Sequence, residues 1–466
     1  MSHPKPVILD QPRTDNPLSS NSVGDWSWQR RQPERSDSEN YYQASVAERG
    51  SYPALDGDAQ CEVLVIGAGL LGASTALHLA EAGVETRLIE QDRVGASASG
   101  RNGGQLTPGL ARWEAEAMAQ HLPSDEAARL WRFTAQESMA LIEAITERYG
   151  LALDLQRGHL TAAIHPGHLA ALQEGIDARR RLGDQEPELL TRDALQAHVV
   201  TDAYYGAVLD PVGGHLHPLA LTLGMVQAFA NLGGHLHEQT SAKAIRHRGG
   251  RVEVVTNGGL ISAEKVVVAT HVSTHQLLPK QARATIPFYS YVAVTGPIAG
   301  GSAALMPTGK ALYDTSLQID YYRRVRGERL LFGGSGSGSR WSIDRARQYF
   351  EQRFQHLFPQ QAPFEIDYLW SGAADLTARG PAASHCIDEQ IYSVFGWSGH
   401  GVAQTVRIGQ AISDAIRGDN DDFEMLCRIP NPSIPFGRQL APFAIPIGIA
   451  LLELRARLQP SKLISF

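Results

Sequence analysis

Three glycines with the spacing G-x-G-x-x-G, Gly67, Gly69 and Gly72, stand where an apolar strand gives way to a predicted helix. The free N–H groups and dipole of a helix N-terminus attract an anion such as a pyrophosphate. The first glycine permits the tight bend, the second admits the phosphates, and the third lets helix and strand pack closely. The turn, which also contains Leu70 and Leu71, therefore indicates dinucleotide binding.

The elements on both sides of this turn form a βαβ unit. The run CEVLVIGAG, residues 61–69, predicts a strand buried on both faces, and a period of 3.6 predicts a helix over residues 70–82. The next strand ends at Glu90 and Gln91, where a carboxylate can accept hydrogen bonds from ribose hydroxyls. This motif does not distinguish NAD from FAD.

Two further glycine-rich segments follow. GASASGRNGGQ, residues 95–105, has the composition of a flexible loop, and the alternative is an ordered backbone cradle for a cofactor. GWSGHGV, residues 396–402, lies between a predicted strand and a predicted helix. Free amides at that helix N-terminus would stabilise negative charge on a reduced cofactor ring.

With these segments the chain resembles the D-amino acid oxidase-like superfamily of FAD-dependent amine oxidoreductases, and within it the gamma-glutamylputrescine oxidoreductases. The resemblance runs from about residue 41 to 458. It rests on Tyr41-Tyr42, HLAEAG, ASGRNGGQ, LDPVGGHLHPL, DYYR, WSG and WSGHGV. One departure is His271, which stands where the family commonly has a glycine.

The resemblance implies that FAD is the cofactor. Its binding is expected to be non-covalent, because Arg101 rather than a histidine follows Ser99-Gly100, and Cys386 follows the Arg379-Gly380-Pro381 element instead of preceding it. The implied FAD contacts are Gly67, Gly69, Leu70, Leu71, Gly72, Glu90, Gln91, Ser99, Gly100, Arg101, Asn102, Gly103, Gly104, Gln105, Ala242, Ala269, Thr270, Gly372, Gly399, His400, Gly401 and Val402.

In such enzymes a hydride equivalent passes from the carbon that bears a neutral amine to flavin N5, and the resulting imine hydrolyses to an aldehyde. Tyrosines can contact a methylene chain and its cation, and Arg323 can anchor a carboxylate or be a surface charge. Strand alternation allows at most one of Tyr321 and Tyr322 to face the flavin. The candidate catalytic residues are Gln105, His400, Tyr289, Tyr291, Tyr322 and Arg323.

The expected substrate is a gamma-glutamylated polyamine. Two alternatives stay open at this point. One is oxidation of a small amino acid such as glycine, sarcosine or a D-amino acid, which requires an arginine close to the flavin face. The other is a flavin-binding protein without small-molecule turnover.

The length of 466 residues indicates two domains interleaved in sequence. The expected fold combines an α/β, Rossmann-like FAD-binding domain with an α+β substrate domain built on an antiparallel sheet. The FAD-binding domain is assigned to residues 41–110, 204–275 and 365–420, and the substrate domain to 111–203 and 276–364. Residues 1–40 are expected to form a disordered tail, and 421–466 an extension packed on the body.

The net charge of −7 gives no broad attraction to nucleic acid. Three widely spaced cysteines and histidines without an HExxH pattern predict no metal site and a cytoplasmic protein. No run reaches the length of a spanning helix, although residues 441–458 can make peripheral membrane contact. The oligomeric state is left open.

Overall fold

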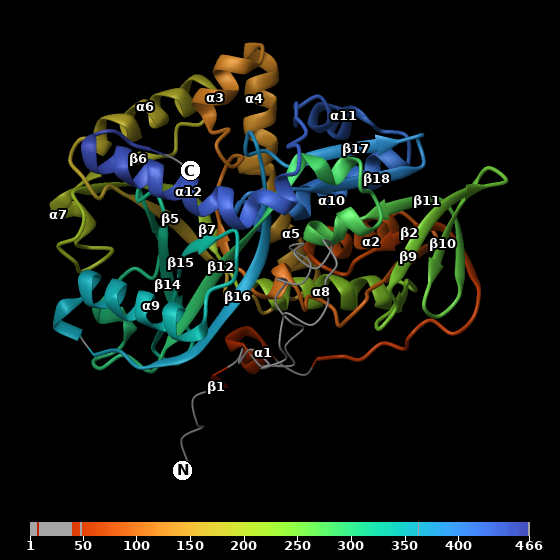
Figure 1. The fold of residues 1–466 in the computed structure, drawn as a ribbon, viewed down its shortest axis with the longest axis horizontal. Helices are drawn as coiled ribbons and strands as arrows, with labels where there is room; N and C mark the ends of the chain where they lie inside the picture. The colour runs from red at the N-terminus through yellow and green to blue at the C-terminus, as the bar shows by residue number, and fades with distance from the viewer. Residues whose placement is uncertain (1–6, 9–39, 47–48, 362, 465–466) are drawn as a thin grey trace.

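Two β-sheets lie side by side in the molecule, as Figure 1 shows. The computed structural model describes residues 7–8, 40–46, 49–361 and 363–464. The tail expected over residues 1–40 lies outside the described residues, apart from Val7, Ile8 and Asn40.

The first sheet is mainly parallel. Its strands, in spatial order, are β17 (Ala383–Ile387), β18 (Ile391–Phe395), β11 (Leu260–Val268), β2 (Ala59–Ile66), β3 (Thr86–Ile89) and β8 (His235–His237). Neighbours from β18 to β8 run parallel, and β17 is antiparallel to β18. A hairpin of β9 (Ala242–Arg248) and β10 (Arg251–Thr256) continues the sheet from β11.

Both faces of this sheet are covered, which explains the continuous apolar run of β2. Helices α2 (Leu70–Glu81), α8 (Pro218–Asn231) and α10 (Gly401–Ile416) share a core cluster with Val65. Leu64, on the opposite face, packs in a cluster with β10 and β11. The helix predicted over residues 70–82 and the Rossmann-like βαβ unit are therefore confirmed.

The second sheet is mainly antiparallel. Its strands, in spatial order, are β1 (Val7–Ile8), β16 (Ile366–Thr377), β12 (Thr285–Thr295), β15 (Arg329–Ser337), β14 (Asp320–Val325), β13 (Ala311–Asp314), β5 (Gln156–Ala162), β7 (Gly206–His215) and β4 (Gln105–Leu106), with β6 (Glu188–Thr191) paired to β7. The parallel pairs are β1 with β16 and β13 with β5. The α/β and α+β combination expected from the sequence is present.

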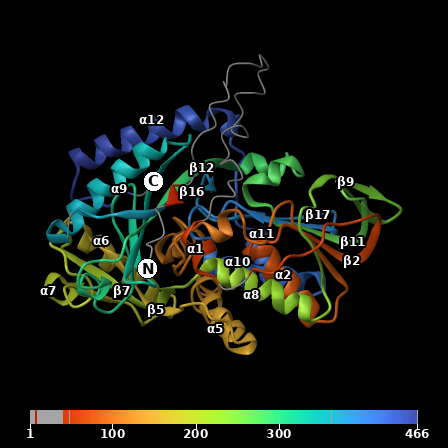
Figure 2. The same cartoon turned by 90° about the horizontal axis from the view of Figure 1, so that it is seen from below.

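The remaining helices pack around the two sheets and between them, with α11 against α10 and β17 of the first sheet. They are α1 (Tyr41–Ser45), α3 (Ala115–His121), α4 (Ser124–Arg132), α5 (Ser138–Tyr149), α6 (His168–Arg181), α7 (Arg192–Leu195), α9 (Ile343–Leu357), α11 (Asp421–Cys427) and α12 (Gly437–Leu458). Figure 2 shows α12 as a long helix along the outer edge of the molecule. Among the described residues, α12 alone has the length and composition of a membrane-crossing helix.

Three strands within the ranges expected for the FAD-binding domain are strands of the second sheet. They are β4 in residues 41–110, β7 in residues 204–275 and β16 in residues 365–420. The physical reason is pairing: β16 joins β12 in antiparallel register from Thr285 to Thr295, and β7 joins β5. The exact domain boundaries stay a prediction.

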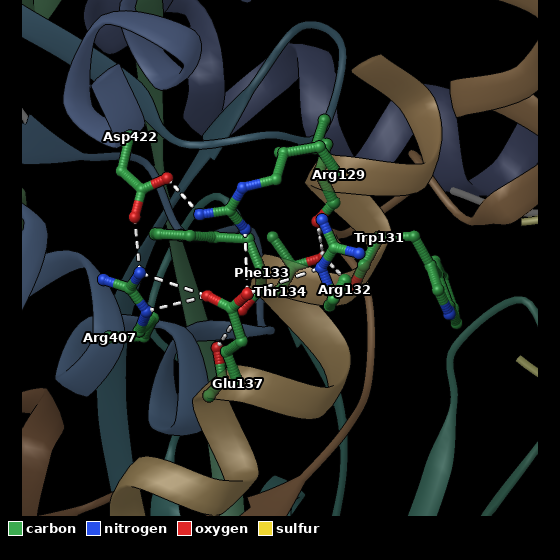
Figure 3. A network of polar contacts seen from close by, with 10 residues as sticks. Arg129, Trp131, Arg132, Phe133, Thr134, Glu137, Arg407 and Asp422 are labelled. Atoms are coloured by element: carbon green, nitrogen blue, oxygen red, sulfur yellow. Dashed lines mark hydrogen bonds and ion pairs between the residues drawn. The ribbon is translucent and has the colours of Figure 1, made fainter. Parts of the chain in front are cut away.

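A polar network fixes α10 against the helices inserted after β4 (Figure 3). Glu137, in a π-helical turn between α4 and α5, accepts from Arg129 at 3.0 Å and from Arg407 of α10 at 3.1 Å. Asp422 of α11 pairs with both arginines, and the Arg407 guanidinium lies 4.4 Å from the centre of the Phe133 ring. The network thus positions the helix that begins in GWSGHGV.

Candidate cofactor and substrate site

The turn between β2 and α2 has the backbone conformation that the glycine spacing predicts. Gly67 has a φ of +104°, which favours glycine, and its N–H donates to the Ile89 carbonyl at 2.8 Å. A Cβ at Gly72 would collide with the Gly67 carbonyl oxygen. A Cβ at Gly69 would lie 2.7 Å from Ser99 Oγ. All three positions therefore require glycine.

The second glycine segment touches this turn. Ser99 lies in a 3₁₀ turn, Ala98–Gly100, and its hydroxyl accepts from the Leu70 N–H at 2.9 Å. Ser99 thus lies at the N-terminus of α2, where the free amides attract an anion. The loop and the helix N-terminus form one continuous backbone surface.

Glu90 holds the turn from the end of the next strand. One carboxylate oxygen accepts from the Ala68 N–H at 2.9 Å, and the other accepts from the Asp92 N–H at the same distance. Backbone amides therefore fix the carboxylate at the carboxyl end of β3. Gln91, beside it, is exposed.

Residues 95–105 form an ordered segment rather than a flexible linker, because side chains from distant parts of the sequence donate hydrogen bonds to their carbonyl groups. The Arg101 carbonyl accepts from the Trp370 indole at 2.9 Å. The Asn102 carbonyl accepts from the Tyr42 hydroxyl at 2.7 Å, and the Gly103 carbonyl accepts from Arg323 Nε at 2.7 Å. The cradle alternative is the one that the structure supports.

The other residues implied for the cofactor gather at two places near these segments. The Ala269 carbonyl oxygen is 2.7 Å from where a Gly67 Cβ would be, which puts Ala269 and Thr270 beside the first turn. Ala242 begins β9, next to a loop whose Thr240 N–H donates to the Glu90 carbonyl at 2.7 Å. Gly372 of β16 faces Arg101, because a Cβ added at this glycine would lie 3.6 Å from Arg101 Cβ.

The third segment ends in the N-terminus of α10, as predicted. Gly401 begins the helix, His400 precedes it, and Gly399 has a φ of +91°. Burial lowers the pKa of His400 to about 4, so the imidazole is neutral at neutral pH. Its Nδ1 is buried without a hydrogen-bond partner among the described residues. Val402, in the first turn, is buried.

These features fit FAD. The glycine turn leaves no side chain where phosphates approach the N-terminus of α2, and the second segment supplies a held backbone beside it. His400 Nδ1, which has no hydrogen-bond partner among the described residues, and the free amides at the N-terminus of α10 could form hydrogen bonds with the polar edge of the flavin ring. Residues of the three segments would thus hold the dinucleotide from its phosphates to its ring.

Gln105 joins this cradle to a histidine that the sequence analysis did not single out. Gln105 Nε2 donates to the Leu312 carbonyl at 3.0 Å, which turns Oε1 toward His159 Nε2 at 3.1 Å. Because the amide oxygen can only accept, His159 Nε2 carries the proton and Nδ1 is the acceptor. Burial, opposed by the nearby Asp210 carboxylate and assisted by His400, lowers the pKa of His159 to about 4.

Tyr313 completes this group. Its ring centre lies 4.7 Å from that of His159, from the adjacent strand β13. Burial raises the pKa of its phenol well above the usual value, so the hydroxyl is protonated. Gln105, His159, Tyr313 and His400 thus form a neutral polar cluster. Single residues on short strands carry no sequence signal, and only the β5–β13 pairing reveals His159 and Tyr313.

Two of the predicted catalytic residues have other roles. Tyr322 is fully buried, stacks on Phe332 at 5.5 Å and donates to the Tyr204 hydroxyl at 3.2 Å. Arg323 is 2% exposed and donates to the carbonyl oxygens of Gly103 and Leu216, so it braces the second glycine segment rather than a substrate carboxylate. Strand alternation directs Tyr322 to the core covered by α9. The catalytic role of both residues stays a prediction.

Tyr289 and Tyr291 lie in that same core cluster, together with Phe350 and Phe354 of α9. Tyr291 stacks on Trp341 at a centroid distance of 5.1 Å. By contrast, Tyr321 lies against the glycine segment, since a Cβ at Gly103 would collide with its ring. The substrate-lining role of Tyr289 and Tyr291 stays a prediction. Of the adjacent residues Tyr321 and Tyr322, Tyr321 is the one that contacts the second glycine segment.

His271 adopts the backbone conformation that explains the glycine of relatives. Its φ is +48°, in the left-handed region. Its Nε2 lies 2.6 Å from Oδ1 of Asp375, a fully buried residue of β16. The histidine therefore accepts an unfavourable backbone conformation and gains a short polar contact that links the two sheets. Among the described residues, no group of three or more His, Cys, Asp or Glu side chains could hold a metal.

Comparison with known proteins agrees with this geometry. A family model described as FAD dependent oxidoreductase, DAO, matches residues 62–415. The chain is 33% identical over 422 residues to the gamma-glutamylputrescine oxidoreductase of Escherichia coli (strain K12), covering 90% of this chain and 98% of that relative. It is 32% identical to the probable oxidoreductase OrdL of Haemophilus influenzae, covering 88% of this chain and 95% of that relative.

The fold is shared with solved flavoenzymes. Glycine oxidase from Bacillus cereus superposes with a TM-score of 0.66 at 22% identity, covering 80% of this chain and all of that one. The L-proline dehydrogenase of P. horikoshii superposes with a TM-score of 0.64 at 20% identity, covering 77% of this chain and 94% of that one. With a family match over most of its length and a glycine cradle that fits the cofactor, this chain belongs to the DAO family of FAD-dependent oxidoreductases and is an amine oxidoreductase with FAD as its cofactor.

Proposed function

We propose that this enzyme oxidises the amine of a gamma-glutamylated polyamine, with FAD bound non-covalently. The observation that carries the proposal is the 33% identity to the gamma-glutamylputrescine oxidoreductase of Escherichia coli, which extends over 90% of this chain. Bound FAD would supply the acceptor for the two electrons and the hydrogen removed from the carbon next to nitrogen.

The cluster around Gln105 supports an amine as the substrate. An alkylammonium must lose a proton before the adjacent C–H bond can be oxidised, and a buried cluster of neutral groups favours the neutral amine over its charged form. His159 and His400 both have pKa values lowered to about 4 by burial, so both imidazoles are neutral where the enzyme would work. Gln105 sets the His159 tautomer and leaves Nδ1 as the acceptor.

The arginines beside the cradle favour a polyamine over a small amino acid. A small amino acid would need a guanidinium close to the flavin for its carboxylate. Arg323 donates to two main-chain carbonyl groups and to the Tyr42 hydroxyl, and Arg101 Nε donates to the Ser371 carbonyl at 3.2 Å. In a gamma-glutamylated amine the carboxylate lies many bonds from the reacting carbon, so it needs no arginine at this position.

The test is anaerobic reduction of the purified holoenzyme by a panel of amines. We expect gamma-glutamylputrescine to bleach the flavin band near about 450 nm, a property of the oxidised cofactor, faster than putrescine, glycine, sarcosine or D-alanine. Faster bleaching by glycine or sarcosine would instead establish the small-amino-acid reaction. A flavin that none of these compounds bleaches would contradict catalysis, and admission of air with a peroxide assay then identifies oxygen as an acceptor or excludes it.

A further inference from the structure

Helix α12 carries an apolar stripe that faces away from the protein. Leu440, Phe443, Ile447, Leu451, Leu454 and Leu458 are between 51% and 73% exposed. From residue 439 to 452 the helix contains no charged side chain. Isolated exposed apolar residues are ordinary, but a continuous row of six along one helix marks a binding surface. The helix lies beyond residue 415, where the match to the family model ends.

The opposite face holds α12 on the second sheet. Ala441, Ile445 and Ile449 are buried and pack with Ile286 and Phe288 of β12. Arg438 donates to the Thr285 hydroxyl at 3.0 Å, and Gln318 donates to Glu453 at 3.0 Å. With one face seated on the protein, α12 can lie along a surface but does not cross one.

The spacing of the stripe suits a flat partner. Five steps lead from residue 440 to 458, an average of 3.6 residues, which is the period of a straight α-helix. A coiled-coil seam repeats every 3.5 residues and would drift by about 50° over this length. The stripe is about 27 Å long and roughly 10 Å wide, so it offers about 270 Å², well short of the about 800 Å² per partner of a standard protein interface.

The charges around the stripe complement an anionic surface. At 100° per residue, Arg455 and Arg457 lie about 80° to either side of the centre of the stripe. Lys462 follows, so residues 453–462 contain three basic side chains and one acidic side chain in a chain of net charge −7. Arginines that flank an apolar face can extend to phosphate groups while the apolar residues enter the acyl boundary.

We propose that α12 is the surface through which this enzyme binds, in the plane of the interface, to an anionic phospholipid bilayer. The enzyme body contributes one sheet as the support, and Phe443, Ile447 and Leu451 enter the lipid. Arg455 and Arg457 add attraction to the headgroups. The substrate and cofactor residues described above are not part of this surface, so the proposal is independent of which amine is oxidised.

The experiment is flotation of the holoenzyme with vesicles of phosphatidylcholine and phosphatidylglycerol in equal amounts. We expect the wild-type protein to float with these vesicles and to bind phosphatidylcholine vesicles less. The triple variant Phe443→Ser, Ile447→Ser and Leu451→Ser should lose at least about a hundredfold in partition coefficient, because each large apolar side chain contributes about tenfold or more. The matched control is Leu232→Ser, which changes an exposed apolar residue on another surface and should bind normally.

Flavin content and light scattering complete the test. The triple variant should retain stoichiometric FAD, which shows that it is folded, and Arg455→Gln with Arg457→Gln should reduce binding to the anionic vesicles alone. Wild-type protein that does not float, or a triple variant that floats equally well, would overturn the proposal. If the wild type is a dimer and the triple variant is a monomer, the stripe binds a second copy of the protein. If vesicle binding appears only after deletion of residues 1–39, the stripe is covered by that segment.

Discussion

Acid should destabilise this protein through His159, and the size of the effect follows from its environment. Burial lowers the pKa of His159 to about 4, whereas a histidine in the unfolded chain titrates near about 6.5. Above pH 6.5 neither state binds the proton, so the histidine does not affect stability. As the pH falls from 6.5 to 4, His159 binds a proton in the unfolded chain but not in the folded protein, so the free energy of unfolding decreases. Between pH 7 and pH 5 the loss is about 2 kcal/mol for this residue.

The perturbation that isolates this contribution is His159→Asn. The variant loses the hydrogen bond to Gln105, so we expect its free energy of unfolding at pH 7 to be about 1 kcal/mol lower than that of the wild type. Its loss between pH 7 and pH 5, however, should be about 2 kcal/mol smaller, because no imidazole remains to be protonated. The comparison is a double difference, which cancels contributions of the other titrating groups.

Urea unfolding of the holoenzyme at both pH values, followed by tryptophan fluorescence with reversibility checked by dilution, measures both differences. The control is His235→Asn, at an exposed position, which should leave the pH dependence of the wild type unchanged. If His159→Asn loses as much stability between pH 7 and pH 5 as the wild type does, then the imidazole is not held neutral and the cluster around Gln105 has been misunderstood.

Three further substitutions test the cradle and its supports. Gly69→Val should abolish FAD retention, because its side chain would strike Ser99 where the phosphates approach, while Gly175→Ala, in an open helical position, should retain full flavin absorbance. His271→Gly should lower the melting temperature although it relieves a positive φ. The loss of the contact to buried Asp375 costs about 3–5 kcal/mol, against about 1–2 kcal/mol gained from the relieved backbone. His271→Asn, which tolerates that φ, should have an intermediate melting temperature, and a glycine variant more stable than the wild type would contradict a stabilising role of the contact between His271 and Asp375. Glu137→Gln should destabilise the protein by about 1–2 kcal/mol in urea titration, more at low than at high salt, because three arginines lose a half-buried carboxylate.

Local periodicity was enough to predict the first sheet and its turn. The apolar run of β2, the three glycines and the following helix are contiguous, so their geometry follows from neighbours in sequence. The family resemblance then supplied the second and third glycine segments. Composition could not predict that residues 95–105 are ordered. Their carbonyl groups accept hydrogen bonds from Trp370, Tyr42 and Arg323, which come from distant parts of the chain.

The substrate side was harder to predict because it depends on which face of a strand points inward. Tyr321 and Tyr322 are adjacent, and the register of β14 on β15 decides which of them meets the glycine segment. His159 and Tyr313 meet only because β5 and β13 pair in parallel, an exception in a mainly antiparallel sheet. The pairing of β7 and β16 within the second sheet could not be predicted for the same reason, since strand pairing over long sequence distances leaves no local pattern.

The interleaved order of the strands has a consequence for synthesis of the protein. Helix α2 is made early, but its packing partner α10 and the neighbouring strand β18 come from residues 391–416, near the end of the chain. A nascent chain that still lacks these residues exposes the apolar face of the first sheet and lacks the turn at His400. The flavin can therefore be captured only after residues 391–416 have been made, and chains truncated before residue 416 should require chaperones and leave the ribosome without cofactor.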